Sequence, residues 1–175
     1  MEQQQCGLMT SDSPDAASQQ LYQRIRIKAM SLLAGRELSE AQLRQKLQAC
    51  CAEAASADLL AQVVAQVVEE FRGQGWQNDA RAAEAVWRAA QRQHWGPLRT
   101  RQVLQERGLA SEVPEACTEI TWVEAAIALL NRRYGACTSP VTPADQARML
   151  RYLAGRGYTG GQCHAAFKRW TQASV

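Results

Sequence analysis

Apolar residues recur every three or four positions along most of the chain, which is the spacing that places them on one face of an α-helix. The pattern starts near residue 15, where Leu21, Ile25, Met30 and Leu33 follow one another at roughly this interval. No segment alternates apolar and polar residues over more than four positions, as a half-buried strand would. The pattern therefore predicts an all-α protein without a β-sheet.

Helix start and stop signals divide this pattern into nine predicted helices. Ser39 and Gln42 have the spacing of a capping box, and Thr159 and Gln162 repeat that spacing near the end of the chain. The predicted helices lie near 15–34, 39–51, 58–73, 79–90, 97–107, 111–119, 122–134, 143–157 and 159–170. The residues before about 14 are polar, rich in glutamine and unpatterned, so we expect a disordered N-terminal tail there.

The nine helices form three successive groups of three, because the middle helices of the groups can be aligned. The aligned pairs are Leu43 and Leu47, Thr100 and Leu104, and Met149 and Leu153. The second members of these pairs are 57 and 49 residues apart. A helical module of this size is marginal alone but becomes stable when it stacks on a neighbour. We therefore expect a tail at 1–14 and three tandem three-helix modules, at 15–74, 75–121 and 122–175, forming an elongated, curved, repeat-like array.

The composition agrees with a folded helical protein, and the charge distribution adds a functional hint. Of the 175 residues, 46% are hydrophobic and 21% are charged, and glycine and proline are scarce. The net charge is +3, but residues 80–110 carry +4 and residues 125–175 carry +6, whereas residues 111–124 carry −4. The second half of the chain would therefore attract a partner that carries phosphates or carboxylates.

Sequence motifs for catalysis, nucleotide binding and metal binding are missing. There is no phosphate-binding loop, no G-x-S-x-G elbow and no H-E-x-x-H pair. The six cysteines lack C-x-x-C spacing and His94 lies far from His164, so we expect free thiols and no zinc site. The apolar runs are too short to cross a bilayer, and the N-terminus does not resemble a signal peptide. We expect a cytoplasmic protein that is not an enzyme, with no catalytic residues, no metal and no cofactor.

Arginines on the predicted helix surfaces are the remaining candidates for function. Arg81, Arg88 and Arg92 stand at i, i+7 and i+11, so they lie close to one line along a helix, opposite its apolar face. The candidate partner-binding residues are cations of the second half: Arg81, Arg88, Arg92, Arg99, Arg101, Arg148, Arg151, Arg156, Lys168 and Arg169. The alternative is that such residues only keep outer faces soluble, with Arg107, Arg132 and Arg133 complementing the dipoles at helix C-termini.

Four segments of the chain resemble the bacterial RecX recombination regulators. They are 29–47 (AMSLLAGRELSEAQLRQKL), 75–79 (GWQND), 96–104 (GPLRTRQVL) and 153–158 (LAGRGY). They occur in the order and spacing of that family, and the likeness spans about 29–170. The chain departs from the family where Thr100 replaces an aliphatic residue and Val103 a polar one, which predicts a slight rotation of that helix. Gly155 stands where a second basic residue is frequent.

The resemblance implies a non-enzymatic modulator of the RecA recombinase that lies in the groove of the RecA filament on DNA. By occupying that groove, such a protein blocks strand exchange and suppresses the ATP turnover and the co-protease activity of RecA, and so modulates recombination, DNA repair and the SOS response. The partners implied are RecA, the RecA-DNA filament and DNA phosphates. We expect a monomer, because stacked modules bury their apolar faces against one another.

Two other functions remain open at the level of the sequence. The arginine line of 81, 88 and 92 could bind DNA phosphates by itself, without sequence preference. Alternatively, the protein could be a plain helical interaction scaffold. Binding to bare DNA as tight as binding to the RecA filament would favour the first alternative, and the lack of salt-dependent binding to any acidic partner would favour the second.

Overall fold

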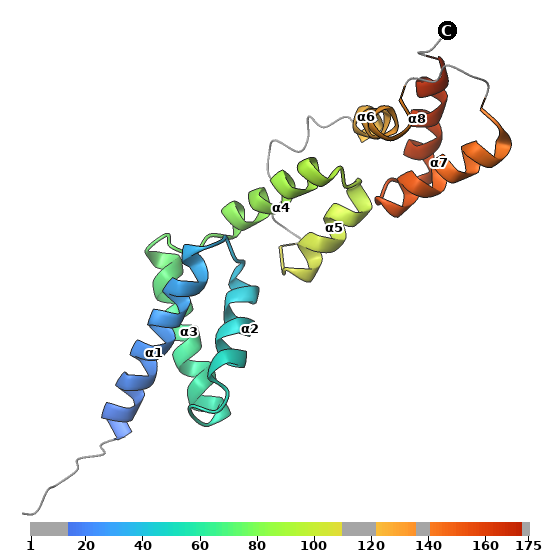
Figure 1. Cartoon of the computed structure of the whole chain (residues 1–175). Helices are drawn as coiled ribbons and strands as arrows, with labels where there is room; N and C mark the ends of the chain where they lie inside the picture. The colour runs from blue at the N-terminus through green and yellow to red at the C-terminus, as the bar shows by residue number, and fades with distance from the viewer. Residues whose placement is uncertain (1–13, 110–121, 136–140, 173–175) are drawn as a thin grey trace, which may run out of the picture. The chain divides into compact units, whose positions relative to one another are not determined.

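A computed structural model describes residues 14–109, 122–135 and 141–172, which form eight α-helices and no strand. The helices are α1 (Pro14–Ala34), α2 (Glu40–Cys51), α3 (Ala57–Gly73), α4 (Asp79–Gln93), α5 (Pro97–Glu106), α6 (Trp122–Tyr134), α7 (Pro143–Gly155) and α8 (Gly160–Gln172). The all-α prediction is confirmed, and the helices follow one another along the chain as in Figure 1. The predicted helix at 111–119 and the predicted tail, apart from Pro14, lie outside the described residues.

The chain divides into two compact units, of which the first comprises Met1–Arg36 and Gln42–Gln77. In this unit α1 packs beside α3, with Leu21 and Ile25 of α1 and Phe71 of α3 in the core. Met30 was expected on the same apolar face, but it is 45% exposed, and the buried residue there is Ala29. The physical reason is helical geometry: a step of four from Ile25 stays on the buried face, whereas a step of five turns away from it.

The second unit comprises Glu37–Ala41 and Asn78–Val175, and its described residues form two apolar clusters. One joins α4 and α5 through Ala83, Val86, Leu104 and Leu109. The other joins α6, α7 and α8, and it consists of Ala126, Leu129, Leu130, Met149, Leu153, Tyr158, Cys163, Ala166 and Trp170. The module boundaries at 74/75 and 121/122 remain predictions.

The predicted starts of α4, α7 and α8 agree with the observed caps. Thr159 donates its backbone N–H to the side-chain oxygen of Gln162, and Gln162 donates its N–H to the Thr159 hydroxyl, which is the reciprocal arrangement of a capping box. Asn78 caps α4 by accepting from the N–H of Arg81 at 3.0 Å. Thr142 caps α7 in the same way, with Pro143 following as the first helical residue.

The aligned middle helices of the predicted modules are equivalent in their burial. All six aligned residues are buried, namely Leu43, Leu47, Thr100, Leu104, Met149 and Leu153. Thr100 lies inward although it is polar. Its fully buried hydroxyl donates to the carbonyl of Gly96 at 2.9 Å, which satisfies the polar group there. The slight rotation of α5 relative to other members of the family stays a prediction.

α5 begins directly against the end of α7. The N–H of Gly96 donates to the carbonyl of Arg156 at 2.7 Å, and the N–H of Leu98 donates to the carbonyl of Gly157 at 2.9 Å. The backbones approach so closely that a Cβ on Gly96 would lie 2.4 Å from the Gly157 carbonyl carbon. These bonds hold the start of α5 and the end of α7 together inside the second unit.

Candidate functional site

An arginine-lined hollow of about 360 Å³ lies in the second unit, where the C-terminal ends of α4 and α6 meet α7. We call it the arginine hollow. It is lined by Arg92, Gln93, His94, Leu129, Arg132, Arg133, Tyr152 and Arg156. Four of these eight side chains are arginines and none is a carboxylate, so the hollow concentrates positive charge.

The end of α4 places Arg92 and His94 at the hollow. His94 adopts a left-handed backbone conformation (φ 52°, ψ 47°), which residues other than glycine rarely adopt. The reversal lets the N–H of Trp95 donate to the carbonyl of Ala90 at 2.9 Å, which ends the helix in the manner of a Schellman motif. A histidine therefore takes a backbone position that glycine usually fills, and its ring lines the hollow.

Tyr152 of α7 organises two of the arginines. The guanidinium of Arg133 lies over its ring at 4.1 Å from the centroid, and that of Arg156 lies over the ring at 5.5 Å. Tyr134 packs edge-on against the same ring. The hydrogen bond to Tyr152 is the main reason why the pKa of Arg133 is raised from its ordinary value. Aromatic stacking of this kind keeps a guanidinium in one place while its N–H groups, which lie in its plane, stay available.

Two further contacts fix the remaining polar groups. Arg156 donates to the carbonyl of Gln93 at 3.0 Å. Arg132 lies 2.9 Å from Nε2 of His94, and because a guanidinium can only donate, this nitrogen is the acceptor of the contact. Arg92 is exposed and has no ion-pair partner among the residues that the structure describes. The arrangement can therefore offer several N–H donors and a net positive charge to an anion.

The predicted binding residues separate into three groups in the structure. Arg92 and Arg156 belong to the arginine hollow. Exposed cations with no ion-pair partner in the described ranges are Arg101, Arg151 and Lys168. The others have intramolecular partners: Arg81 pairs with Glu37, Arg88 with Glu84, Arg148 with Asp145 and Arg169 with Glu124, while Arg99 stacks on Trp95 at 4.9 Å.

The predicted line of three arginines on α4 is therefore largely neutralised. Arg81 lies 3.0 Å from a carboxylate oxygen of Glu37, and Arg88 lies 3.3 Å from one of Glu84. The structure brings together a different set of residues around the hollow. To the predicted Arg92 and Arg156 it adds Arg132, Arg133, His94 and Tyr152. The signal available in the sequence was the pair of adjacent arginines at the end of α6, which entered only in the alternative interpretation, as complements to the helix dipole.

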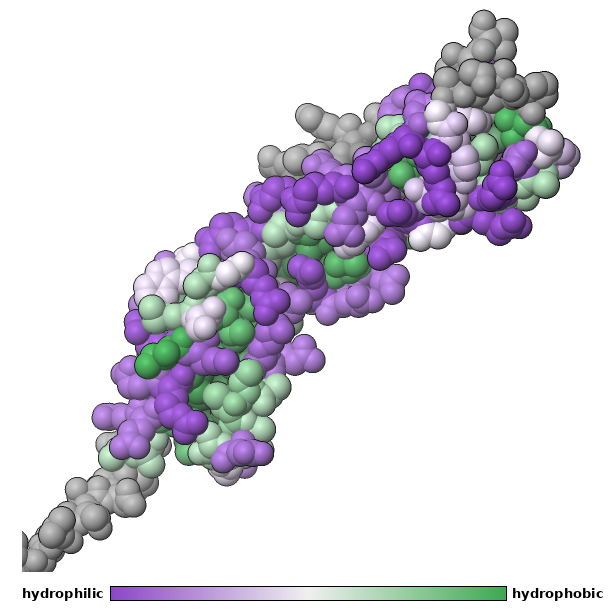
Figure 2. All heavy atoms as spheres, viewed as in Figure 1, coloured by the Kyte–Doolittle hydropathy of each residue, from purple (hydrophilic) through white to green (hydrophobic). Residues whose placement is uncertain are grey.

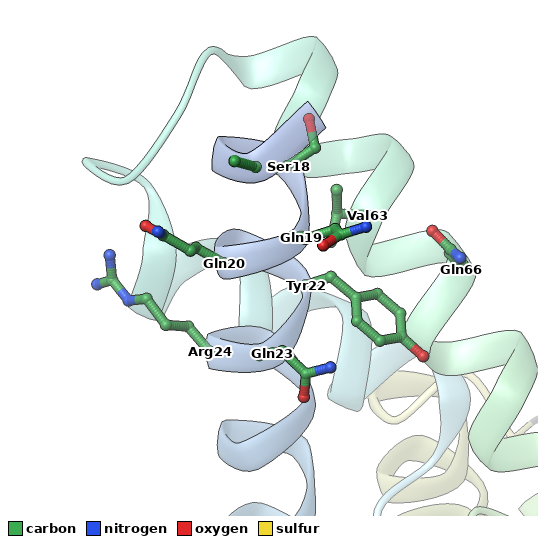
Figure 3. Close-up of a pocket in the computed structure, with 9 residues that line it drawn as sticks. Ser18, Gln19, Gln20, Tyr22, Gln23, Arg24, Val63 and Gln66 are labelled. Atoms are coloured by element: carbon green, nitrogen blue, oxygen red, sulfur yellow. The ribbon is translucent and has the colours of Figure 1, made fainter. Parts of the chain in front are cut away.

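A larger hollow, of about 820 Å³, lies in the first unit between α1 and α3. Its lining is mostly amides and small side chains, with Arg24 as its one cation among the described residues. Figure 3 shows Gln19 of α1 and Val63 of α3 next to each other between the two helices. This lining carries no cluster of charged or nucleophilic groups, so the arginine hollow is the stronger candidate site.

Two further features of the described residues concern metal binding and membranes. No group of three or more His, Cys, Asp and Glu side chains lies close enough together in this part of the chain to hold a metal ion. None of the described helices combines the length and apolar character that crossing a membrane requires. Hydrophilic side chains predominate on the face of each unit that Figure 2 shows.

Comparison with known proteins gives one family. A family model described as the second three-helix domain of RecX matches residues 78–116. The regulatory protein RecX of Acidithiobacillus ferrooxidans (strain ATCC 53993 / BNL-5-31) is 40% identical over 132 residues, which are 75% of this chain and 81% of that protein. The regulatory protein RecX of Xanthomonas campestris pv. campestris (strain B100) is 35% identical over 142 residues, with coverage of 79% and 83%.

The fold agrees with this relationship. The crystal structure of RecX from Lactobacillus salivarius superposes with a TM-score of 0.69 over 88% of this chain and 99% of that chain. Its sequence identity is only 15%, so this similarity concerns the fold alone. The identity to the curated relatives over most of their length carries the assignment: the chain belongs to the RecX family of regulatory proteins.

Proposed function

We propose that the protein is a non-enzymatic cytoplasmic regulator that binds the RecA filament in its groove and inhibits the recombinase, ATPase and co-protease activities of RecA. The membership of the chain in the RecX family supports a regulatory role. The observation that carries the proposal is the concentration of cations in the second unit that pair with no carboxylate of the described residues, namely the arginine hollow together with Arg101, Arg151 and Lys168. Such a surface attracts the acidic and phosphate-bearing faces of a nucleoprotein filament.

The repeat of helical modules offers a physical route to tight binding. Each exposed cation contributes little alone, because solvent and salt screen a surface charge. When several weak patches sit on one chain, binding of the first raises the effective concentration of the others. A monomer of three tandem modules that contacts more than one RecA protomer would gain affinity in this way.

The test is an assay of DNA-dependent ATP hydrolysis by purified RecA, with this protein added over a range of ratios. Inhibition is expected, and the protein alone should hydrolyse no nucleotide. Inhibition at well below one molecule per several protomers indicates that filament growth is blocked, whereas a requirement for near stoichiometry indicates groove filling. An unchanged ATPase rate at a severalfold excess of this protein over RecA would contradict the proposal.

A second candidate function is sequence-independent DNA binding without RecA. The arginine hollow favours it, because guanidinium groups without neighbouring carboxylates suit phosphates. A pull-down with RecA, with and without single-stranded DNA and nucleotide, distinguishes the two functions. Capture that depends on DNA alone supports the second candidate, and capture that needs RecA supports the first. A plain scaffold would show neither.

A further inference from the structure

We propose that the arginine hollow is a phosphate-binding site, in which Arg92, Arg132, Arg133 and Arg156 donate hydrogen bonds to the oxygens of a phosphodiester or of a free phosphate chain. This inference deepens the second candidate function, because it names the site and the chemistry of its ligand, and it does not depend on inhibition of RecA. It rests on the lining of the hollow, on the two guanidiniums held over Tyr152, and on the contact of His94 with Arg132.

The number of cations in the hollow points to a ligand with several negative charges. Four arginines surround about 360 Å³, and no carboxylate among the lining residues offsets their mutual repulsion. A single carboxylate carries one charge and can accept the paired hydrogen bonds of one guanidinium group. A phosphate offers more acceptor oxygens, and consecutive phosphates can satisfy several guanidinium groups at once.

The contacts of the Tyr152 ring indicate that the hollow recognises phosphate and not a nucleic-acid base. Single-strand binders commonly stack bases on exposed aromatic rings. Here the ring of Tyr152 already has the guanidiniums of Arg133 and Arg156 over it, at 4.1 and 5.5 Å, and the edge of Tyr134 beside it. The ring therefore serves to orient donors, so binding should show no sequence preference.

The contact of His94 with Arg132 supplies a second observation. Among the described residues other than glycine, only His94 has a positive φ, and this reversal of the backbone ends α4. It places Nε2 of the His94 ring 2.9 Å from Arg132. His94 thereby positions an arginine for the ligand without competing for the anion.

The experiment measures binding of a fluorescein-labelled oligothymidylate of 20 nucleotides by fluorescence anisotropy, at several salt concentrations. The variant Arg132→Gln/Arg133→Gln should bind about tenfold more weakly, and its plot of log affinity against log salt should be flatter by about 1.4, because each lost contact with a single strand removes about 0.7 from the slope. The matched control is Arg24→Gln/Lys28→Gln, which removes the same charge from exposed positions of the first unit, outside the hollow. This control should lose less than about threefold.

A third variant guards against a loss of structure, since Arg133 packs on Tyr152. Arg92 is exposed and has no ion-pair partner in the described part of the chain, so Arg92→Gln should leave the thermal unfolding curve unchanged while weakening binding by about threefold. Unweakened binding by both Arg92→Gln and the double hollow variant would overturn the proposal. Equal losses in the hollow variant and the matched control would overturn it as well.

Competition distinguishes the source of the phosphate. Displacement of the oligonucleotide by inorganic pyrophosphate supports a site that accepts a free phosphate chain. Resistance to pyrophosphate, with the loss in the hollow variant retained, supports a site for the nucleic-acid backbone. Displacement by poly-glutamate as effective as that by pyrophosphate would show a general anion surface and overturn the assignment. The RecA ATPase assay fails or succeeds separately, so the two proposals can be judged apart.

Discussion

At the scale of single residues, the close approach of α5 to the end of α7 depends on two glycines, Gly96 and Gly157. The sequence marked both as helix boundaries, which they are. It could not reveal that they face each other, because their contact joins residues about 60 positions apart and no local pattern encodes such a pair. The contact of Arg132 with His94 was hidden for the same reason, whereas the caps were predictable since each involves residues within one turn.

Replacing Gly157 by alanine should destabilise the second unit. Its φ of 90° lies where an L side chain is strained, and a Cβ there would lie 2.5 Å from the Cβ and 2.6 Å from the nitrogen of Arg99. We expect a loss of about 2–4 kcal/mol in the free energy of unfolding, measured by urea denaturation. The control is Gly155→Ala, because a Cβ at Gly155 meets nothing within 4 Å. That variant should be neutral or slightly more stable, and equal losses in the two would argue against the close approach.

At the scale of helices, the sequence predicted the described elements well because each carries its own apolar face and its own start signal. The three aligned middle helices are the clearest case. Two of them, α5 and α7, also end alike. The N–H of Leu109 donates to the carbonyl of Leu104, and the N–H of Tyr158 donates to the carbonyl of Leu153. In each case the preceding residue is a glycine with positive φ, Gly108 or Gly157. The hollow was less predictable, because it is formed by the ends of three helices whose arrangement depends on tertiary packing.

Truncation of the aligned leucines tests their equivalence. Leu47, Leu104 and Leu153 are all buried, at 0%, 4% and 0% exposure. Each leucine-to-alanine change should cost about 2–5 kcal/mol in the free energy of unfolding, because it removes buried methyl groups and leaves a cavity. Chemical denaturation of the three single variants checks this. A cost below about 1 kcal/mol at two of the positions would break the proposed repeat alignment.

The link between α1 and α3 should weaken in acid. Glu70 of α3 accepts hydrogen bonds from Tyr22, Arg26 and Gln74. The hydrogen bond from Tyr22 is the main reason why the pKa of Glu70 is lowered, and Arg26 adds to the effect. A lowered pKa in the folded state means that the contribution of Glu70 to stability is present above its unfolded pKa and is lost as the pH falls through the folded value.

Thermal unfolding of the wild type and Glu70→Gln between pH 7 and pH 3 measures this contribution. The variant should melt a few degrees lower at pH 7, and the difference should shrink as the pH falls. The neighbouring change Glu69→Gln serves as control, since Glu69 is exposed and pairs only loosely with Arg72, at 3.7 Å. A gap between wild type and Glu70→Gln that stays constant down to pH 3 would contradict the assignment.

At the scale of the whole molecule, charge is the property that the sequence conveyed best and the site is the property that it conveyed least. The cationic second half was evident from residue counts alone. Which cations remain available was not, because ion pairs such as Arg81 with Glu37 join helices to segments far away in the chain. Four of the candidate arginines outside the hollow illustrate this. Arg101 and Arg151 are exposed without an ion-pair partner in the described ranges, Arg99 lies over the ring of Trp95, and Arg148 pairs with Asp145.

Replacing Arg99, Arg101, Arg148 and Arg151 together by glutamine should weaken inhibition of the RecA ATPase about tenfold or more and flatten its salt dependence. All four side chains are exposed, so they contribute long-range attraction and little packing, and helicity by circular dichroism should stay unchanged. The matched control replaces Arg24, Lys28, Arg36 and Arg72, which are exposed cations of the first unit, and removes the same charge. The opposite outcome would be full inhibition by the second-unit variant at physiological salt and loss of inhibition by the first-unit control. Because both variants lose the same charge, their effects can differ only through the positions changed. That outcome would therefore place the RecA contact on the first unit.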